Sequence, residues 1–317
     1  MTLEILNHSY IYSFNFDHHH NELCKLESRQ LFDQEEKDKL LFSNIKVDPS
    51  ISSFIKNRFE IILGSEDYSE LIKKIKEENI HVEGFKVEYL VLDGDATGYR
   101  ERLEKLRDIG YSIEGESNYY TPTKIYSICN YKDVWYFGVL IKQDKDWQKH
   151  KKKPCSFSNS ISMDIAKSLV SIASKGNKNN QLLDACCGVG TVILEACFAG
   201  FNIEGCDINW KAIKHTRLNL EHFNYTAQVY CLDIKNLNKK YDAAIIDLPY
   251  NLYSYSNDLI MANIIESTAK LADRIVIVSI SDITNFINNT GFRILDCCNV
   301  GKSGKGNFAR KIWVCES

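Results

Sequence analysis

The carboxyl-terminal half of the chain alternates short apolar runs with stretches of helical spacing. Near-continuous apolar runs separated by helices are typical of a parallel sheet that is covered on both faces. Seven strands are predicted, at residues 181–187, 201–208, 227–234, 242–249, 274–280, 292–300 and 309–316. The last two runs are joined only by "GKSGKGNF", a glycine-rich stretch with no helical pattern. We therefore expect a hairpin there, with the last strand antiparallel to its neighbour.

The first 150 residues mix both patterns without regular alternation, which favours an α+β arrangement. Two helical faces are indicated by Tyr68, Leu71, Ile72 and Ile75, and by Tyr99, Leu103 and Leu106. Strands are predicted at residues 85–93 and 135–141. Residues 142–154 are rich in lysine and end at Pro154, so the boundary between the two halves is expected there. A lysine cluster suits a solvated linker as well as a phosphate contact, and both readings stay open.

Composition changes this picture only slightly. The chain has 317 residues, 44% hydrophobic and 26% charged, with a net charge of −3. This length favours more than one domain. Because the whole chain is nearly neutral, any nucleic-acid contact must come from a local basic patch. The sequence has no apolar run long enough to span a membrane and no signal-peptide pattern at its start, so a cytoplasmic protein without membrane contact is expected.

The cysteines and histidines do not form a metal-binding pattern. None of the 11 cysteines lies in a Cys-x-x-Cys spacing, and the adjacent pairs would point to opposite faces of a strand. We expect buried, reduced thiols and no bound metal. The run at residues 18–20 is three histidines without partner cysteines, and we interpret it as a solvated turn, with a metal site as the weaker alternative.

A glycine loop, "DACCGVGT" at residues 184–191, follows the first predicted strand of the sheet. A dinucleotide fingerprint would need glycine or alanine where Ile193 stands. A phosphate-binding P-loop fails as well, because the glycine that should precede "GKS" is Asp296. Acids end the following strands, at Asp207, Asp233 and Asp247, where open α/β sheets bind their ligands. For each acid alone, capping of a helix is the competing explanation, and it fits Asp233 best.

This combination resembles class I S-adenosylmethionine-dependent methyltransferases, whose first motif is an acid followed by Gly-x-Gly. The resemblance implies that Gly188 and Gly190 let the backbone approach the cofactor. It also implies that Asp184 meets the ammonium group or orders the loop. Asp207 would accept the ribose hydroxyls, and Asp233 would lie near the adenine amine. The expected cofactor site comprises Asp184, Cys186, Gly188, Gly190, Thr191, Asp207, Ile208, Asp233 and Ile234.

The tetrapeptide "DLPY" at residues 247–250 resembles the Asp/Asn-Pro-Pro-Tyr motif of methyltransferases that act on exocyclic or amide nitrogens. An aromatic amine is a poor nucleophile, because its lone pair is delocalised. Hydrogen bonds from the amine to the Asp247 carboxylate and the Leu248 carbonyl would aim the lone pair at the methyl group. Tyr250 would stack on the base, and Pro249 would fix the turn. Leucine in place of the first proline keeps the carbonyl and loses some backbone stiffness.

The amino-terminal half resembles that of THUMP-containing tRNA guanine-N2 methyltransferases, through Tyr-Arg-x-Arg at residues 99–102 and Trp-Tyr-Phe-Gly at residues 135–138. The expected architecture is an α+β ferredoxin-like and THUMP half before a Rossmann-like class I methyltransferase domain. The expected bounds are 1–55 for the ferredoxin-like part, 56–146 for THUMP, 147–154 for the linker and 155–317 for the methyltransferase domain. This resemblance implies RNA contacts by Arg100, Arg102, Lys124, Lys151, Lys152, Lys302 and Arg310. A solvated helix face is the competing explanation for any one of the helical cations.

We therefore expect an S-adenosylmethionine-dependent RNA methyltransferase that acts on an exocyclic base nitrogen, with guanine N2 of tRNA favoured. Adenine N6 of RNA or DNA is the alternative substrate, and a non-catalytic RNA-binding protein is the alternative of a different class. The expected partner is tRNA or another structured RNA, and a monomer is favoured.

Overall fold

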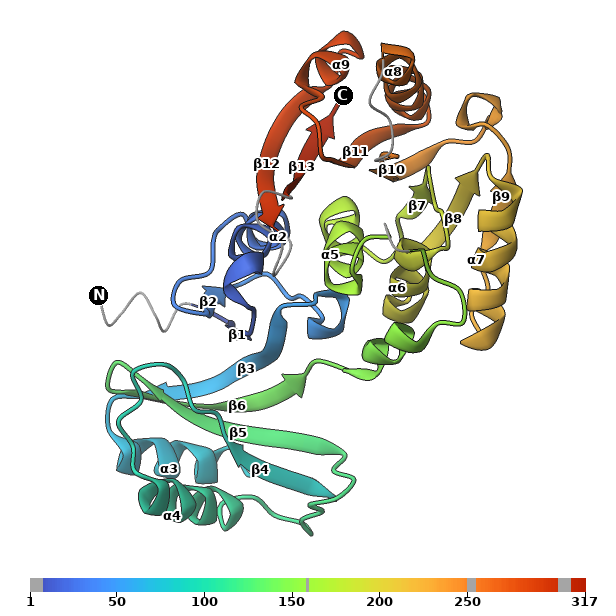
Figure 1. The fold of residues 1–317 in the computed structure, drawn as a ribbon. Coiled ribbons are helices and arrows are strands. Elements are labelled where there is room, and N and C mark those ends of the chain that lie inside the picture. Colours follow the sequence, from blue (N-terminus) through green and yellow to red (C-terminus); the bar gives the residue numbers. More distant parts are fainter. Residues whose placement is uncertain (1–7, 158–159, 250–254, 302–308) are drawn as a thin grey trace. The chain divides into compact units, whose positions relative to one another are not determined.

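The computed structural model describes residues 8–157, 160–249, 255–301 and 309–317, and the side chains of residues 255–257 are outside this description (Figure 1). The chain forms two compact units. Unit 1 comprises residues 1–15, 36–49 and 54–143, and unit 2 comprises residues 16–35, 50–53 and 144–317. Each unit is built around its own sheet.

Unit 1 is an α+β unit with a six-stranded sheet in the order β2-β1-β3-β6-β5-β4. Its strands are β1 (Tyr10–Phe14), β2 (Leu40–Ser43), β3 (Ile55–Ser65), β4 (Phe85–Tyr89), β5 (Lys124–Tyr131) and β6 (Val134–Lys142). Its helices α3 (Tyr68–Glu77) and α4 (Tyr99–Gly110) lie on one face of the sheet (Figure 1). The predicted apolar face of α3 buries Leu71 and Ile75 against the sheet. The predicted face of α4 is wrong in part, because Tyr99 and Leu103 are exposed and the helix buries Ile109 instead. The helical spacing alone did not show which side of α4 faces the sheet.

The division of this half differs from the expected bounds. β1 and β2, from the expected ferredoxin-like part, pair with β3 from the expected THUMP part, so residue 55 does not separate two sheets. The helix α2 (Asn21–Phe32) belongs to unit 2 instead. The reason is that its apolar face, with Leu23, Leu26 and Leu31, is buried against elements of unit 2. The spacing of apolar residues predicts such a face, but it does not show which unit the face contacts. Strands β1, β2, β3 and β5 were not predicted.

Unit 2 contains a seven-stranded sheet in the order β12-β13-β11-β10-β7-β8-β9. Its strands are β7 (Gln181–Asp184), β8 (Asn202–Asp207), β9 (Gln228–Cys231), β10 (Tyr241–Asp247), β11 (Ala272–Ser279), β12 (Arg293–Gly301) and β13 (Ala309–Glu316). β7 to β11 pair in parallel, whereas β13 is antiparallel to both β11 and β12. The prediction of an antiparallel last strand is confirmed.

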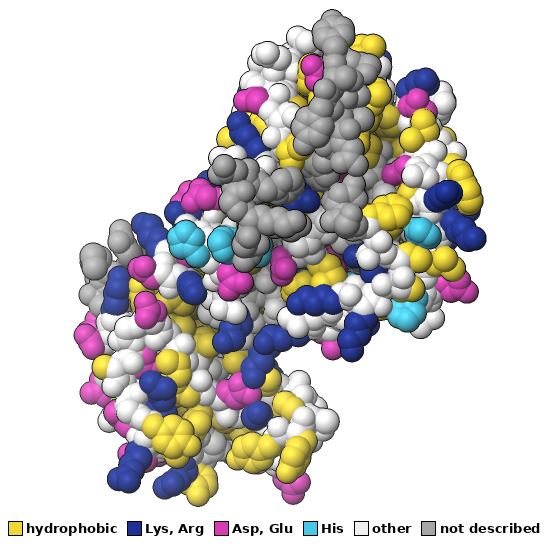
Figure 2. Space-filling model, viewed as in Figure 1, with side chains coloured by type: hydrophobic (Ala, Val, Ile, Leu, Met, Phe, Trp, Pro, Cys, Tyr) yellow, Lys and Arg dark blue, Asp and Glu magenta, His cyan; other side chains and the backbone are white. Residues whose placement is uncertain are grey.

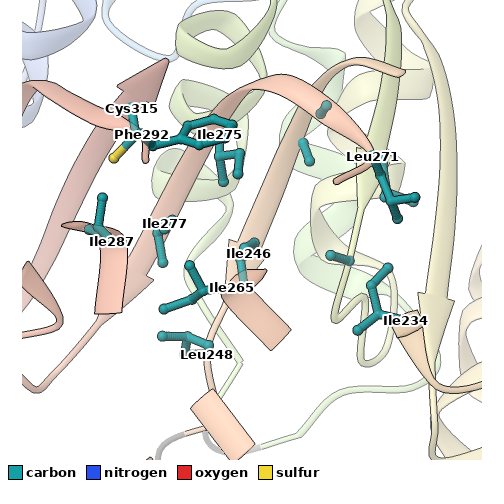
Figure 3. Close-up of a cluster of buried hydrophobic side chains, with 14 of the residues drawn as sticks. Ile234, Ile246, Leu248, Ile265, Leu271, Ile275, Ile277, Ile287, Phe292 and Cys315 are labelled. Atoms are coloured by element: carbon teal, nitrogen blue, oxygen red, sulfur yellow. The ribbon is translucent and has the colours of Figure 1, made fainter. Parts of the chain in front are cut away.

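Helices cover both faces of this sheet (Figure 1). They are α5 (Met163–Ser174), α6 (Thr191–Ala199), α7 (Trp210–His222), α8 (Tyr255–Ala269) and α9 (Thr284–Asn289), with the short turns η3 (Asp146–Lys152) and η4 (Ile234–Asn236). One face packs Ile246, Ile275 and Ile277 of the sheet against Ile265 of α8 and Ile287 of α9 (Figure 3). On the opposite face, the side chain of Arg274 in β11 donates hydrogen bonds to the carbonyl of Ile172 in α5.

A buried carboxyl joins α2 to α5 within unit 2. Glu27 is 1% exposed, and its carboxylate accepts hydrogen bonds from the hydroxyls of Ser52, at 2.5 Å, and Ser171. Burial raises the pKa of Glu27 from 4.5 to about 7, although both hydroxyls and the charge of Lys167 oppose that shift. The attachment of α2 therefore depends on a carboxyl that gains a proton when the chain folds.

The raised pKa of Glu27 leads to a prediction of how the free energy of unfolding changes with pH. Between about pH 4.5 and pH 7 the folded state holds a proton on Glu27 that the unfolded chain releases. The contribution of Glu27 to the free energy of unfolding is therefore expected to fall as the pH rises through this window. Denaturant titrations at several pH values should show a smaller pH dependence for Glu27→Gln than for the unaltered protein. Glu22→Gln, at an exposed position of the same helix, is the control, and an equal dependence in all three proteins would contradict the assignment.

The described residues lack two features. No helix among them is long and apolar enough to cross a membrane. Within the same residues, no group of three or more His, Cys, Asp or Glu side chains could hold a metal ion. His18, His19 and His20 form the short turn η1 before α2.

Candidate active site

The glycine loop connects β7 to α6, as expected, and both of its glycines adopt positive φ. Gly188 has φ +52° and Gly190, the residue before α6, has φ +79°, a region that side chains with a Cβ rarely adopt. A Cβ on Gly190 would lie 2.6 Å from Cγ2 of Thr216, so this position also lacks room. A Cβ on Gly188 would meet no atom within 4 Å, because the glycine faces open space.

Two polar residues of α7 hold the glycine loop through hydrogen bonds, and sequence analysis missed both. The hydroxyl of Thr216 donates to the carbonyl of Gly188 at 2.8 Å. The side-chain amide of Asn219 donates to the carbonyls of Val189, at 2.8 Å, and Cys155, at 2.9 Å. Both side chains are fully buried. Their positions in a helix of alternating polar and apolar residues carry no signal, because only the folded contact shows which polar residues point inward.

Asp207 at the end of β8 ties that strand to the loop. One carboxylate oxygen accepts from the N–H of Gly188 at 2.9 Å, and the other accepts from the N–H of Asn209 at 2.8 Å. Asp233 follows β9, and it caps η4 through the N–H of Lys235 at 3.1 Å. That hydrogen bond and the ammonium of Lys235 lower the pKa of Asp233. Asp233 is therefore a helix cap, as the competing explanation held, and it also lines the pocket described below.

Asp184, the acid of the glycine motif, ends β7 and is 1% exposed. Its Oδ1 is buried without a hydrogen-bond partner in the described part of the chain. Burial raises the pKa of Asp184 well above its ordinary value, and the nearby carboxylates of Asp247 and Asp207 raise it further. Three acids from three strands therefore interact electrostatically at one edge of the sheet.

Asp247 ends β10 beside these acids, and Leu248 follows the strand. Burial raises the pKa of Asp247 to about 7, and the positive charge of Arg310 opposes this shift. The N–H of Leu248 donates to the carbonyl of Val278 at 3.0 Å, and its side chain is 1% exposed within the core shared with α8 (Figure 3). Pro249 is exposed, and Tyr250 lies outside the described residues.

The environment of Leu248 predicts that proline would not improve this motif. Proline has no N–H for the carbonyl of Val278 and fills less of the core, so Leu248→Pro is expected to lower the free energy of unfolding by about 3 kcal/mol. Denaturant titration measures this loss. Leu248→Met keeps the N–H and the volume, and should lose less than about 1.5 kcal/mol. Equal stability of Leu248→Pro and the unaltered protein would contradict the structural role of the leucine.

One pocket of about 390 Å³ brings most of the predicted site together. Six predicted cofactor residues line it, namely Cys186, Gly188, Asp207, Ile208, Asp233 and Ile234. Asp247, Leu248 and Pro249 line it as well, so the glycine loop and the end of β10 share one cavity. The remaining predicted residues, Asp184, Gly190 and Thr191, are buried and do not line it.

Other wall residues were not predicted, namely Phe157, Ser160, Ala185, Asn209, Ala212, Leu232, Ile260 and Ile264. Phe157 and Ser160 come from the lead-in to α5, where the N–H of Cys155 donates to Asn219 at 2.9 Å. Asn209 caps α7 through the N–H of Lys211 at 3.0 Å. Ala185 belongs to the glycine-loop motif, whereas the other positions carry no motif and reach the pocket only because separate elements meet at this edge of the sheet.

The predicted RNA-contacting cations have different environments. In unit 1, Arg100 is exposed, Arg102 lies over the ring of Tyr89 and Lys124 lies over the ring of Tyr126. Figure 2 shows basic and hydrophobic side chains intermixed on the visible face of this unit. In unit 2, Lys151 and Lys152 are exposed at the end of η3.

The carboxyl-terminal cations differ from the expectation. Arg310 is only 7% exposed, so it is not the exposed phosphate contact that its place in a basic hairpin suggested. The physical reason is its position in β13, where Arg310 is a buried position next to the exposed Ala309. Lys302 lies outside the described residues.

One family model matches the segment that contributes most of the pocket lining. Residues 150–258 match the family model described as the RMKL-like methyltransferase domain. This segment contains the glycine loop, β7 to β10 and Asp247. The chain therefore contains a methyltransferase domain, and its sheet has the Rossmann-like fold of class I methyltransferases.

Curated relatives match only part of the chain. The tRNA (guanine(10)-N2)-dimethyltransferase of Methanothermobacter thermautotrophicus is 30% identical over 118 residues, which are 36% of this chain and 35% of that protein. The enzyme of the same name from Methanocaldococcus jannaschii is 31% identical over 101 residues, or 28% of each chain. This chain thus matches about a third of the length of these relatives.

The crystal structure of TrmN from Thermus thermophilus aligns with 98% of this chain and all of that chain, at 13% identity and a TM-score of 0.49. A likeness at this level does not bear on function.

Proposed function

We propose that this chain is an S-adenosylmethionine-dependent RNA methyltransferase that modifies an exocyclic nitrogen of a base, with guanine N2 of tRNA as the favoured acceptor. The observation that carries the proposal is the shared pocket: the glycine loop and the Asp247-Leu248-Pro249 turn line one cavity within the matched methyltransferase domain. The partial similarity to enzymes named for guanine N2 of tRNA supports the choice of acceptor.

The pocket has features that fit the cofactor. The open space in front of Gly188 is room that a Cβ would take from a ligand, and the loop approaches the pocket through its backbone. Gly188, Asp207, Ile208, Asp233 and Ile234 would hold the cofactor, and the buried Oδ1 of Asp184 offers an unused acceptor behind the loop. When bound, S-adenosylmethionine supplies an electrophilic methyl group on a sulfonium.

The chain's own residues would then prepare the acceptor. The Asp247 carboxylate and the Leu248 carbonyl accept hydrogen bonds from the amine, which frees the nitrogen lone pair to form the new N–C bond. As that bond forms, the electrons of the breaking C–S bond stay with sulfur and the nitrogen gives up a proton. We infer that Asp247 takes this proton, because a pKa of about 7 suits a group that accepts protons near neutral pH.

The target base must leave its stack to reach such a pocket. We propose that unit 1 and the turn η3, which follows unit 1 in the sequence, contact the RNA, in keeping with the ferredoxin-like and THUMP expectation for this half of the chain. The exposed cations Arg100, Lys151 and Lys152 are the candidate phosphate contacts. Arg102 and Lys124 stay candidates, although both already lie over tyrosine rings of unit 1.

The experiment that tests the proposal has two readouts. Protein is incubated with bulk tRNA and S-adenosylmethionine labelled in the methyl group, and label in the RNA is counted. Binding of S-adenosylhomocysteine is measured by calorimetry on the same preparation. The proposal expects both transfer and binding. Binding without transfer to any RNA would favour a non-catalytic protein on this fold, and the absence of both would remove the cofactor assignment.

A further inference from the structure

Arg310 lies at the same edge of the sheet as Asp247 and shares its face. Asp247 in β10 pairs with Val278 in β11, and Val278 pairs with Ile312 in β13. Side chains of directly paired residues point to the same face of a sheet, and residues two apart in a strand do so as well. Arg310 precedes Ile312 by two residues, so it points to the face of Asp247. Because β13 is antiparallel, Arg310 extends beyond the row of Asp247, past the carboxyl end of β11.

The burial of Arg310 calls for a partner charge. An arginine side chain does not lose its proton in a protein, and a buried charge is costly unless an opposite charge is close. Burial lowers the pKa of Arg310, and the carboxylate of Asp247 raises it. In return, the charge of Arg310 lowers the pKa of Asp247, which burial raises. The two groups are therefore near enough to stabilise each other's charged form.

The other titratable groups near Asp247 do not replace this cation. Asp184 in β7 and Cys186 in the glycine loop both interact with Asp247, and each would carry a negative charge if ionised. Burial raises the pKa of both groups well above the ordinary values, which favours their neutral forms. Among the described groups that act on Asp247, Arg310 supplies the positive charge.

We propose that Arg310 is a positioning residue that keeps the Asp247 carboxylate ionised and oriented towards the acceptor nitrogen. The inference rests on the proposed function of Asp247. It assigns Arg310 a part in the reaction, whereas sequence analysis had predicted that Arg310 contacts an RNA phosphate. An ionised carboxylate accepts hydrogen bonds from the amine more strongly than a protonated one, and only the ionised form can take up a proton.

The neighbouring Lys311 provides a matched control. It is a cation in the same strand, but it points to the opposite face, where its Nζ lies 4.9 Å from the ring centroid of Trp313 and 4.0 Å from Oδ2 of Asp282. Lys311→Gln therefore removes a positive charge near the same edge without touching Asp247.

The test is the pH dependence of kcat for methyl transfer to tRNA. In Arg310→Gln the acid limb of the profile is expected to move up by about one pH unit or more. Activity at pH 7 then falls about fivefold and recovers as the pH rises. Arg310→Lys should restore much of the profile, and Lys311→Gln should match the unaltered protein. A loss of equal size at every pH, or a raised KM for RNA with an unmoved limb, would overturn the proposal.

A second readout does not need activity. The carboxyl carbons of aspartate are labelled with carbon-13, and the Asp247 signal is identified by its absence in Asp247→Asn. In Arg310→Gln this signal should titrate at a higher pH than in the unaltered protein. Titration at the same pH would overturn the pairing even in an active methyltransferase. A shifted titration in a protein that transfers no methyl group would instead overturn the proposed function and with it the role of Arg310.

Discussion

Replacing Asp247 with asparagine is expected to lower kcat for methyl transfer on the order of 10²–10³-fold. The amide keeps the size of the side chain and one acceptor oxygen, but it has no negative charge and cannot take the proton from the amine. The loss should appear in the chemical step, measured in single turnovers with saturating RNA and cofactor. The affinity for S-adenosylhomocysteine should stay within a few-fold, because the glycine loop and Asp207 are unchanged.

Two controls make this variant informative. The variant also removes the opposite charge beside the buried Arg310, so its free energy of unfolding is measured on the same preparation to separate a loss of chemistry from a loss of fold. Asp242 is the matched control, because it is an exposed aspartate at the other end of β10, where it accepts from the N–H of Gln181 at 2.7 Å. Asp242→Asn should keep its activity. Full activity in Asp247→Asn would remove Asp247 from the reaction.

Gly190→Ala is expected to weaken binding of S-adenosylhomocysteine more than about tenfold, which corresponds to about 1.4 kcal/mol of binding free energy. The added Cβ would lie 2.6 Å from Thr216, whose hydroxyl holds the carbonyl of Gly188. Relief of that clash must move either the loop or the helix that supports it, so the backbone shape at the pocket changes. Calorimetric titration measures the dissociation constant.

Gly200→Ala separates this effect from backbone strain alone. Gly200 follows α6 with φ +77°, close to the φ of Gly190, but a Cβ there would meet nothing within 4 Å. Both variants should lose about 1–2 kcal/mol of stability from the left-handed backbone, and Gly190→Ala should lose more because of its clash with Thr216. Only Gly190→Ala should lose cofactor affinity. Equal affinities in the two variants would show that the loop does not shape the cofactor site.

The methyltransferase half was predictable because its information is local. An apolar strand, a glycine turn and an acid at each strand end are all visible within ten or so residues, and the order of elements determines which ends meet. For Asp233 the sequence left two alternatives open, a helix cap and a cofactor contact. In the structure this residue both caps η4 and lines the pocket. The burial of Arg310 could not be predicted, because its sequence neighbours are basic and only the strand register shows that it shares the face of Asp247.

What sequence could not provide depends on contacts between distant segments. Glu27 contacts Ser171 across 144 positions, and that contact is one of several that join α2 to unit 2. Thr216 and Asn219 support the loop from a helix whose pattern marks them only as polar. Gly205 is similar, because a Cβ there would lie 2.4 Å from Cδ1 of Ile193, and only the packing of α6 on β8 requires a glycine.

The central claim is that this site methylates the exocyclic amine of guanine in tRNA. Its most direct test is to incubate tRNA with the protein and S-adenosylmethionine, digest the RNA to nucleosides and identify the modified nucleoside by mass spectrometry. The account predicts N2-methylguanosine or its dimethyl form, present with the unaltered protein and lost with Asp247→Asn. N6-methyladenosine as the product, or no new methylated nucleoside, would contradict it.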